Sequence, residues 1–505
     1  MQRSNSQVFT RVKSLKPRCA CTGVVWAVAK DYNMEREKVK KSKYEIDMCN
    51  GSIMDKLISF SLPLMLSGIL QLMFNAVDIV VVGRFSGSQA LAAVGSTTAL
   101  INVFTNLFIG ISLGSNVLAA RFYAAGKEKE MAETVHTSIT LALISGIVMA
   151  VAGLAFSGLA LEWMGTPEDV IRQSALYMCI YFMGMPFFML YNYGAAILRA
   201  VGDTKRPLFF LILSGVVNAV LNMILVIVFH MDVAGVAIAT VISQMISCVL
   251  VLGCLVRSEG CYRLCFSKLR IKGVYLKQIF LVGIPAGIQS TVINFSNVLL
   301  QSSVNSFGST AMAGYTAANN LLGFLYVSVN SITQACMSFT SQNYGVKKPK
   351  RMDRVLVDCG ILTVSVSLVL GGCAWFFGPE VLRIYTNDSE VIRCGMEILS
   401  YTTLTYFLCG LMDLFPGALR GMGSSLVPMI LSIIGTVGVR VLWIFGIFPS
   451  HRSLAVLFVS YPASWIATIV MQVSCYWCVR KKSMKNYVLT QQVQRCYDGQ
   501  AVNKL

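Results

Sequence analysis

The chain has 505 residues, of which 55% are hydrophobic and only 13% are charged, and its mean hydropathy is +0.65. A soluble protein of this length would carry about a quarter charged residues, so the composition excludes an ordinary soluble domain and indicates a membrane protein. The net charge of +18 is the usual sign of a nucleic-acid partner, but the distribution of the basic residues explains it otherwise, as shown below.

The first predicted segment, residues 1–45, is polar and basic apart from the short apolar stretch 19–29. That stretch is too short to span a bilayer, so we predict a disordered cytoplasmic tail. Met34, Met48 and Met54 could each start a chain. We expect a chain that begins at Met34 or at Met48 to insert and function normally.

Twelve apolar runs of about 20 residues follow the tail. They lie near 57–83, 92–120, 134–158, 173–198, 207–229, 233–256, 278–305, 312–340, 355–377, 394–419, 427–448 and 453–479. The runs are rich in Gly, Ala, Ser and Met, as packed transmembrane helices are, and they lack the alternation of barrel strands. The sequence therefore predicts an all-α membrane protein with twelve transmembrane helices.

The basic residues divide unequally between the two sides of these helices. With the N-terminus inside, 36 of the 42 Lys and Arg residues lie in cytoplasmic segments, five lie on the opposite side, and Arg440 lies within a helix. This asymmetry predicts that both termini are cytoplasmic. It also accounts for the net charge, so we expect no nucleic-acid partner. We further expect a monomer in the lipid bilayer of the plasma membrane.

The chain repeats itself with an offset of 221 or 222 residues. Pro63 matches Pro285, and the turn LRAVGDTKRP at 198–207 matches LRGMGSSLVP at 419–428. Each half holds six runs, so equivalent helices run in the same direction and form a parallel repeat. The predicted parts are an N-terminal six-helix lobe at 57–256, a cytoplasmic linker at 257–274, a C-terminal six-helix lobe at 275–480 and a cytoplasmic tail at 481–505.

Ionisable residues inside membrane helices are costly and are therefore functional candidates. In the first half the candidate is Asp78. Gln71 and Asn75 precede it by seven and three residues, so the three form a polar stripe on one helix. In the fifth run Asn218 and Asn222 are i, i+4 neighbours on one face. A carboxylate beside amides can bind a cation or take up a proton, or it can simply tie helices together by hydrogen bonds.

The second half breaks the symmetry of charge. The position of Asp78 matches Leu300, and the helix around it carries amides instead: Asn294, Asn297, Gln301 and Asn305. We expect Asn294, Asn297 and Gln301 to line the substrate cavity. Asp413 and Arg440 are the ionisable residues left inside the helices of this half. Two alternatives stay open for them, because they could contact a substrate in a cavity or pair with each other as a buried ion pair.

Several motifs together resemble those of the MATE (multidrug and toxic compound extrusion) transporters, above all the bacterial members. They are FNAVDIVVVGRFSGSQALAAVG at 74–95, RFYAAGKEKE at 121–130 and the repeated LRxxGxxxxP turn, and the resemblance covers about 57–480. It implies two six-helix lobes around a central cavity. It also implies export of amphipathic, usually cationic, organic molecules in exchange for H⁺ or Na⁺, with no further cofactor.

The resemblance also assigns roles to particular residues. The family's acid in the first helix matches Asp78, with a polar residue at the position of Gln71, and its Asn-x-x-x-Asp pattern in the fifth helix matches Asn218 and Asn222. The second carboxylate of that pattern is missing here. Independently of the resemblance, Tyr181 lies among large apolar and aromatic residues that could line a drug cavity, although packing against lipid or other helices is the commoner fate of such residues.

Other functions have weaker support in the sequence. A flippase for lipid-linked saccharides would use a related scaffold, but it would favour more helices and a strongly basic cavity. A membrane-embedded enzyme would need a catalytic constellation, and the chain has no H-E-x-x-H, G-x-S-x-G or Walker motif. The 16 Cys and 3 His residues are scattered without the second ligand pair of a zinc site, so we expect no metal.

Overall fold

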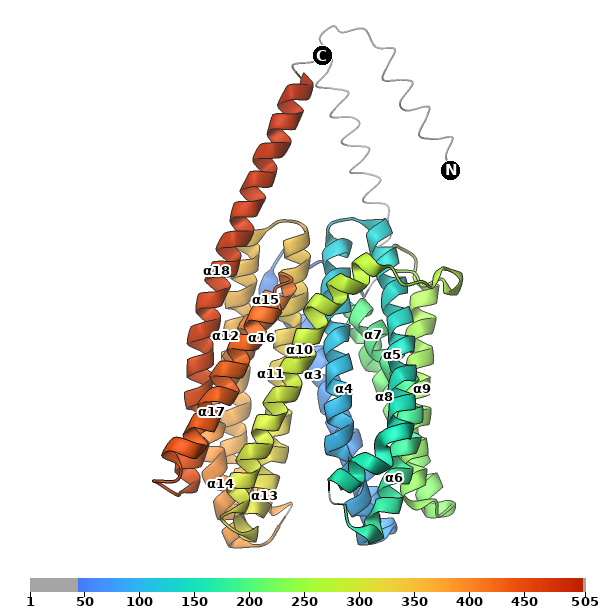
Figure 1. Cartoon of the computed structure of the whole chain (residues 1–505), viewed down its shortest axis with the longest axis vertical. Helices are drawn as coiled ribbons and strands as arrows, with labels where there is room; N and C mark the ends of the chain where they lie inside the picture. Colours follow the sequence, from blue (N-terminus) through green and yellow to red (C-terminus); the bar gives the residue numbers. More distant parts are fainter. Residues whose placement is uncertain (1–43, 165, 385, 503–505) are drawn as a thin grey trace. The chain divides into compact units, whose positions relative to one another are not determined.

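The computed structural model describes residues 44–164, 166–384 and 386–502, and the segment predicted as a tail lies outside them up to Lys43. The regular elements are α3 (Ile53–Phe85), α4 (Gly87–Ala124), α5 (Glu128–Trp163), α6 (Glu168–Met183), α7 (Met185–Ala200), α8 (Lys205–Asn222), η1 (Met223–Val228), α9 (Asp232–Arg257), η2 (Phe266–Lys268), α10 (Gly273–Asn305), α11 (Ser309–Gly345), α12 (Pro349–Phe376), α13 (Gly378–Arg383), α14 (Ser389–Thr402), α15 (Tyr406–Gly421), α16 (Leu426–Ser432), η3 (Ile433–Gly438), α17 (Val439–Leu442), η4 (Trp443–Ile447) and α18 (Leu454–Val502). The prediction of an all-α membrane protein is confirmed, and Figure 1 shows the helices side by side.

Each of the twelve predicted runs lies in a helix or a bent pair of helices. Within the described residues nine helices are long and apolar enough to cross a membrane, or eleven if each of two bent pairs is one span. The bent pairs are Val170–Met183 with Met185–Ala200, bent by 47°, and Ser389–Thr402 with Tyr406–Gly421, bent by 49°. The remaining predicted run, 312–340, lies in α11, whose many Ser, Asn and Gln residues make it less apolar than its neighbours.

The repeated turn adopts the same backbone in both halves. It joins α7 to α8 through Gly202, at φ +96°, and α15 to α16 through Gly423, at φ +86°. This left-handed region is open to glycine at little cost because glycine has no Cβ. Pro207 and Pro428 lie in the first turn of the helix that follows, where a missing backbone N–H costs nothing. The turn therefore has a structural role in both halves.

The two halves of the chain meet where α4 packs on α10 (Figure 1). Gly110 and Gly114 of α4 face Gly283 and Gly287 of α10, and a Cβ on any of the four would overlap backbone atoms of the other helix. Two glycines four residues apart on each helix leave a flat surface, so the two backbones come into direct contact, as in other small-residue helix pairs. We call these four residues the glycine seam.

Residues 44–52, which precede α3, form an N-terminal strap that contacts both halves. On the first half the Glu45 carboxylate accepts hydrogen bonds from the hydroxyls of Tyr123 and Tyr262, each at 2.7 Å. Burial, with the neighbouring Glu45 carboxylate, raises the pKa of Tyr262 to about 12, so its hydroxyl keeps its proton at neutral pH and donates to Glu45. The Arg206 guanidinium lies over the Tyr44 ring, 5.4 Å from its centroid.

On the second half the strap is held through its backbone carbonyls. Asn343 Nδ2 donates to the Met48 carbonyl at 3.1 Å, and Lys348 Nζ donates to the Cys49 carbonyl at 2.9 Å. The strap is thus a short bridge between helix ends of the two halves. It begins inside the segment that the sequence assigns to the tail, because Tyr44 and Glu45 already make these contacts.

Because of the strap, we expect different stabilities for two truncations that the sequence predicts to behave alike. A chain starting at Met34 keeps the whole strap and should have the melting temperature of the full chain. A chain starting at Met48 loses Glu45 and leaves two tyrosine hydroxyls without their acceptor, which should cost about 1–3 kcal/mol of stability. Thermal unfolding of the purified proteins tests this, with Glu45→Gln in the full chain as control. Equal melting temperatures for both truncations would contradict it.

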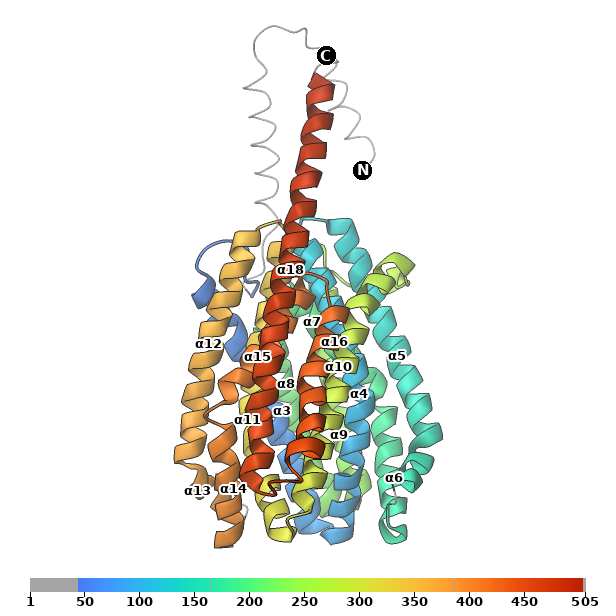
Figure 2. The ribbon, with the colours of Figure 1, turned by 60° about the vertical axis from the view of Figure 1, so that its left-hand side comes forward.

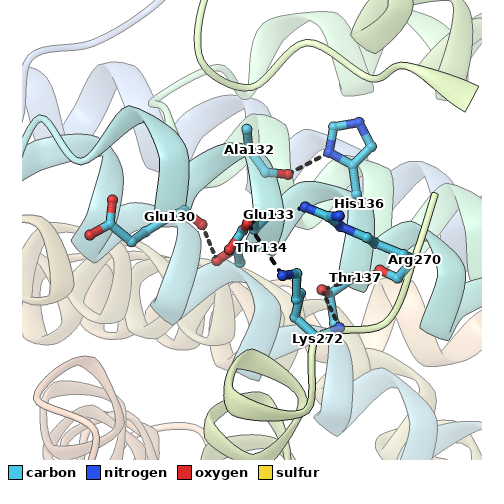
Figure 3. A network of polar contacts seen from close by, with 8 residues as sticks. All are labelled: Glu130, Ala132, Glu133, Thr134, His136, Thr137, Arg270 and Lys272. Carbon is cyan, nitrogen blue, oxygen red and sulfur yellow. Dashed lines mark hydrogen bonds and ion pairs between the residues drawn. The ribbon is translucent and has the colours of Figure 1, made fainter. Parts of the chain in front are cut away.

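The linker between the halves is docked on the start of α5 (Figure 3). Glu133 pairs with Arg270 at 3.3 Å and with Lys272 at 3.7 Å. His136 Nδ1 donates to the Ala132 carbonyl, while its Nε2 accepts from the backbone N–H of Cys265 at 3.2 Å. These two contacts join the start of α5 to the linker, so His136 has a structural role here.

The last helix extends beyond the predicted run. α18 lies along α15 and α16 and continues to Val502 (Figure 2). The residues that the sequence assigns to a separate C-terminal tail therefore continue the final transmembrane helix as far as Val502.

Candidate functional site

The Asp78 side chain is buried between three helices of the first half. It lies in α3 and is only 8% exposed. Asn222 of α8 donates from Nδ2 to Asp78 Oδ1 at 2.5 Å, and the same nitrogen lies 3.3 Å from Asn218 Oδ1. The carboxylate and the two amides that the sequence predicts together therefore form one connected group.

The second carboxylate oxygen is held less firmly. Thr240 Oγ1 of α9 lies 3.4 Å from Asp78 Oδ2 and 2.9 Å from the Val236 carbonyl. A hydroxyl has one hydrogen to donate, and the shorter contact with the carbonyl is the better bond. Among the residues that the structure describes, no Lys or Arg pairs with Asp78. The carboxylate is therefore surrounded by neutral groups.

The oxygen atoms around Asp78 suit a small cation or a proton. Asn222 Oδ1 is buried and has no hydrogen-bond partner within the described part of the chain. Together with Asp78, Asn218 Oδ1 and Thr240 Oγ1 it gives a set of oxygen donors from α3, α8 and α9. Hard cations bind such oxygens, and a lone buried carboxylate can take up a proton instead.

Aromatic residues of α6 form another wall of this site. Tyr177 and Tyr181 stack with their centroids 6.0 Å apart, and both interact electrostatically with Asp78. Tyr181, which the sequence assigns to the substrate cavity, is hydrogen-bonded to Gln244 of α9. The structure therefore groups Tyr181 with Asp78 in the first half.

Of the polar stripe of α3, only Asp78 lies in the buried site. Gln71 and Asn75 are exposed, and no hydrogen bond joins either of them to Asp78 in the described residues. Sequence reasoning missed Thr240 and Tyr177. Neither is ionisable inside the membrane at neutral pH, and each is a single hydroxyl in an apolar run, so no sequence signal marked them.

Asp413 and Arg440 do not pair with each other. Asp413 of α15 is half-buried and interacts electrostatically with Arg420, two turns further along the same helix, and with Tyr326 of α11. Arg420 Nη2 donates to Gln289 Oε1 of α10 at 2.7 Å. Asp413 therefore belongs to a polar cluster shared by α10, α11 and α15.

Arg440 of α17 is 3% exposed, and its hydrogen-bond and ring partners among the described residues are neutral. Its Nη1 donates to Asn297 Oδ1 at 2.9 Å and to Ser296 Oγ at 3.4 Å, and its Nε donates to Ser464 Oγ at 3.3 Å. Its guanidinium carbon lies 4.3 Å from the ring centroid of Tyr461. Asn297 thus joins Arg440, as the sequence grouping suggests.

The other amides of α10 lie elsewhere. Asn294 and Gln301 are exposed side chains, and no hydrogen bond joins them to Arg440 or Asp413 within the described residues. A cavity of about 460 Å³ opens near the ends of α10 and η4. Its lining is Leu299, Ser302, Ser303, Ser306, Ile444, Phe445, Phe448, Pro449 and Arg452. None of the predicted site residues lines this cavity.

Comparison with known proteins matches this geometry to one family. A sequence model of the MatE family matches residues 63–224 and 285–445, which are equivalent segments of the two halves. The chain is 32% identical over 435 residues to the probable multidrug resistance protein YoeA of Bacillus subtilis, covering 84% of this chain and 93% of that protein. It is 25% identical over 392 residues to the probable multidrug resistance protein NorM of Thermotoga maritima, covering 76% and 83%.

Solved structures share the fold. A MATE family transporter of the MOP superfamily in its outward-facing conformation superposes with a TM-score of 0.79 at 20% identity, covering 88% of this chain and 99% of that one. A MATE crystal structure in complex with MaL6 gives a TM-score of 0.80 with the same identity, covering 88% and 99%. The family model covers well over half of the chain, and the YoeA match is 30% identical or better over most of both proteins. This multi-pass membrane protein therefore belongs to the MATE family of multidrug efflux transporters.

Proposed function

We propose that the protein exports amphipathic, cationic organic compounds from the cell in exchange for H⁺ or Na⁺, and that the ion binds at Asp78. One observation carries the proposal: a buried carboxylate in the first half with amide and hydroxyl neighbours and no basic partner in the described chain. Its relatives are named as multidrug resistance and multidrug export proteins. Export of drug-like molecules is the activity that these names support for this chain.

The coupling step follows from the three helices that meet at Asp78. When the carboxylate is charged, an inward-moving cation is attracted to a site where Asp78, Asn218 and Asn222 supply oxygens. When the ion leaves, a bare charge in a buried position is unfavourable. Loading and unloading therefore change the relative free energies of two packings of α3, α8 and α9, which is the basis of alternating access. Gln71 and Asn75, exposed along α3, offer polar groups on the way to the site.

In the second half, Asp413 is proposed to contact the substrate. It is half-buried beside Tyr326, which is 45% exposed, and an aromatic ring next to a carboxylate suits an organic cation. Asn330 Nδ2 lies 3.4 Å from the Tyr326 hydroxyl, and Gln334 Nε2 donates to Asn330 Oδ1 at 2.8 Å. These groups extend the polar surface along α11.

Efflux from reconstituted vesicles tests the proposal. A fluorescent organic cation is loaded with the protein, and a pH gradient and a Na⁺ gradient are imposed in separate experiments. Efflux that follows one of the two gradients supports the antiport and identifies the ion. Efflux that follows neither, or that requires ATP, would reject it.

The topology proposal is tested separately. Both termini and the linker are proposed to be cytoplasmic, because 36 of the 42 basic residues then face inward. α12 separates Lys348 from Glu380, so reporter enzymes fused after these two residues should give opposite signals. Matching signals would reject this topology.

A further inference from the structure

The site at Arg440 occupies, in the second half, the same place as the Asp78 site in the first. Asn297 of α10 matches Asn75 of α3 at an offset of 222 residues, three positions before Leu300, which matches Asp78. The Leu300 side chain is fully buried. The acidic position of the first half is thus an apolar packing position in the second.

The comparison of α18 with α9 supports the equivalence of the two sites. Tyr461 and Ser464 of α18 match Thr240 and Ser243 of α9 at an offset of 221. In both helices these positions face the polar group, since Thr240 contacts Asp78 and Tyr461 contacts Arg440.

Arg440 itself matches Asn218. The π-helical segment η3 precedes it, whereas the equivalent part of α8 is a regular α-helix. A π-helical turn adds one residue, so we infer a local offset of 222 that aligns Arg440 with Asn218. Both side chains are buried, at 3% and 4% exposure. Equivalent helices therefore meet around a carboxylate in one half and around a guanidinium in the other.

The surroundings of Arg440 are those of a bound cation. Its side-chain partners in the described chain offer an oxygen lone pair or an aromatic face: Ser296, Asn297, Ser464 and Tyr461. No carboxylate pairs with Arg440 in the described chain. A site for a small anion would instead present hydrogen-bond donors besides the guanidinium, and Ser464 Oγ donates to the Tyr461 carbonyl.

We propose that Arg440 is a built-in cation, which takes in the second half the place that the exchangeable coupling ion takes in the first. The inference rests on the proposed function of Asp78 and extends it. A guanidinium keeps its charge at physiological pH and cannot leave, so α10, α17 and α18 stay joined through the whole cycle. Only the first half then alternates between ion-loaded and ion-free packings, and one ion site per protein drives transport.

Replacement of the tethered cation by a free one tests this directly. Arg440→Ala removes the guanidinium and should lower both melting temperature and efflux, with efflux falling about tenfold or more because three acceptors lose their donor and the Tyr461 ring loses its cation. Methylguanidinium at low millimolar concentration should restore a large part of both in this variant, by mass-action binding to the folded form. It should leave wild type and Arg452→Ala, a control near the end of η4, unchanged. Rescued efflux should need no gradient of methylguanidinium.

Two results would overturn the inference. One is the absence of any effect of methylguanidinium on the stability and efflux of Arg440→Ala. The other is a wild-type protein that is stabilised by chloride over gluconate, with the effect lost in Arg440→Ala, because this would make the site an anion site.

A second pair of variants keeps the test decisive if Arg440→Ala does not fold. Arg440→Lys keeps the charge, whereas Arg440→Met keeps a similar volume without it. Efflux within about threefold of wild type for Lys and a loss of about tenfold for Met support a built-in cation, since a charge-assisted bond contributes more than a neutral one. Equal efflux for the two variants would refute it.

The proposed function can fail separately. The proposed function fails if the Asp78→Asn protein still couples efflux to the ion gradient as wild type does. The stability response of Arg440→Ala to methylguanidinium does not involve Asp78 and should also occur in the double variant with Asp78→Asn. If Asp78→Asn uncouples transport but methylguanidinium has no effect on Arg440→Ala, the inference alone fails.

Discussion

Asp78→Asn should abolish gradient-driven efflux, down to the level of protein-free vesicles, while expression and membrane insertion stay near normal. The amide has the shape of the carboxylate and its oxygen can still accept the hydrogen bond from Asn222. It can neither carry a charge nor take up a proton, so the driving ion loses its binding site. The measurement is dye efflux under an imposed ion gradient, together with the amount of protein recovered from the membrane.

Asp55→Asn is the matched control for this prediction. Asp55 lies in the first turn of the same helix, and its side chain is exposed. An identical chemical change there should leave efflux unchanged. Wild-type efflux in Asp78→Asn, or equal losses in both variants, would remove Asp78 from the coupling step.

The second large effect is expected at the glycine seam. Gly287→Ala places a methyl group 2.6 Å from the Leu107 carbonyl oxygen and 2.8 Å from its Cα. Backbone atoms cannot rotate away as the end of a flexible side chain can, so α10 must move off α4. We expect a loss of about 1–3 kcal/mol of stability, seen as a lower melting temperature, and a corresponding loss of efflux.

Gly372→Ala on α12 provides the opposite control. A Cβ at Gly372 meets no atom within 4 Å. Alanine is favoured over glycine in a helix by about 1 kcal/mol, so this variant should be as stable as wild type or more stable. Two identical substitutions should therefore change the melting temperature in opposite directions. A decrease of the same size in both would show that the seam has no special role.

The sequence predicts the scaffold well because hydropathy and charge asymmetry act along the chain. The bent pairs show where this reasoning ends. Pro186 lies just after Gly184 at the first bend and is visible in the sequence, whereas the bend at 403–405 has no proline to mark it. Run lengths locate a membrane crossing but do not give its path.

The sequence predicted the site residues only where polar side chains that are costly in a membrane also recur at helical spacing. Asp78, Asn218 and Asn222 stand out because a charge and two amides are costly in apolar runs. The seven-residue spacing also placed Gln71 on the same face of α3 as Asp78. Such spacing shows which residues share a helix face, but it does not show which other helix packs against each of them. Gln71 lies about two turns away from Asp78 and is exposed. Thr240 and Tyr177 reach the site through the packing of α6 and α9, which no local pattern encodes.

The polar character of α11 has a consequence for how the protein is made. Its side chains toward the neighbouring helices include Ser328, Ser331, Thr333, Ser338, Thr340, Ser341, Gln342 and Asn343, all buried by contacts with protein. Helices α3, α4, α12, α14 and α15 supply those contacts, and three of them are synthesised after α11. A nascent chain that ends at Gly345 has only the part of this cover that α3 and α4 supply, so α11 is a poor candidate for release into lipid by itself. Its full burial waits for α12, α14 and α15, which links the insertion of α11 to the synthesis of the helices that follow it.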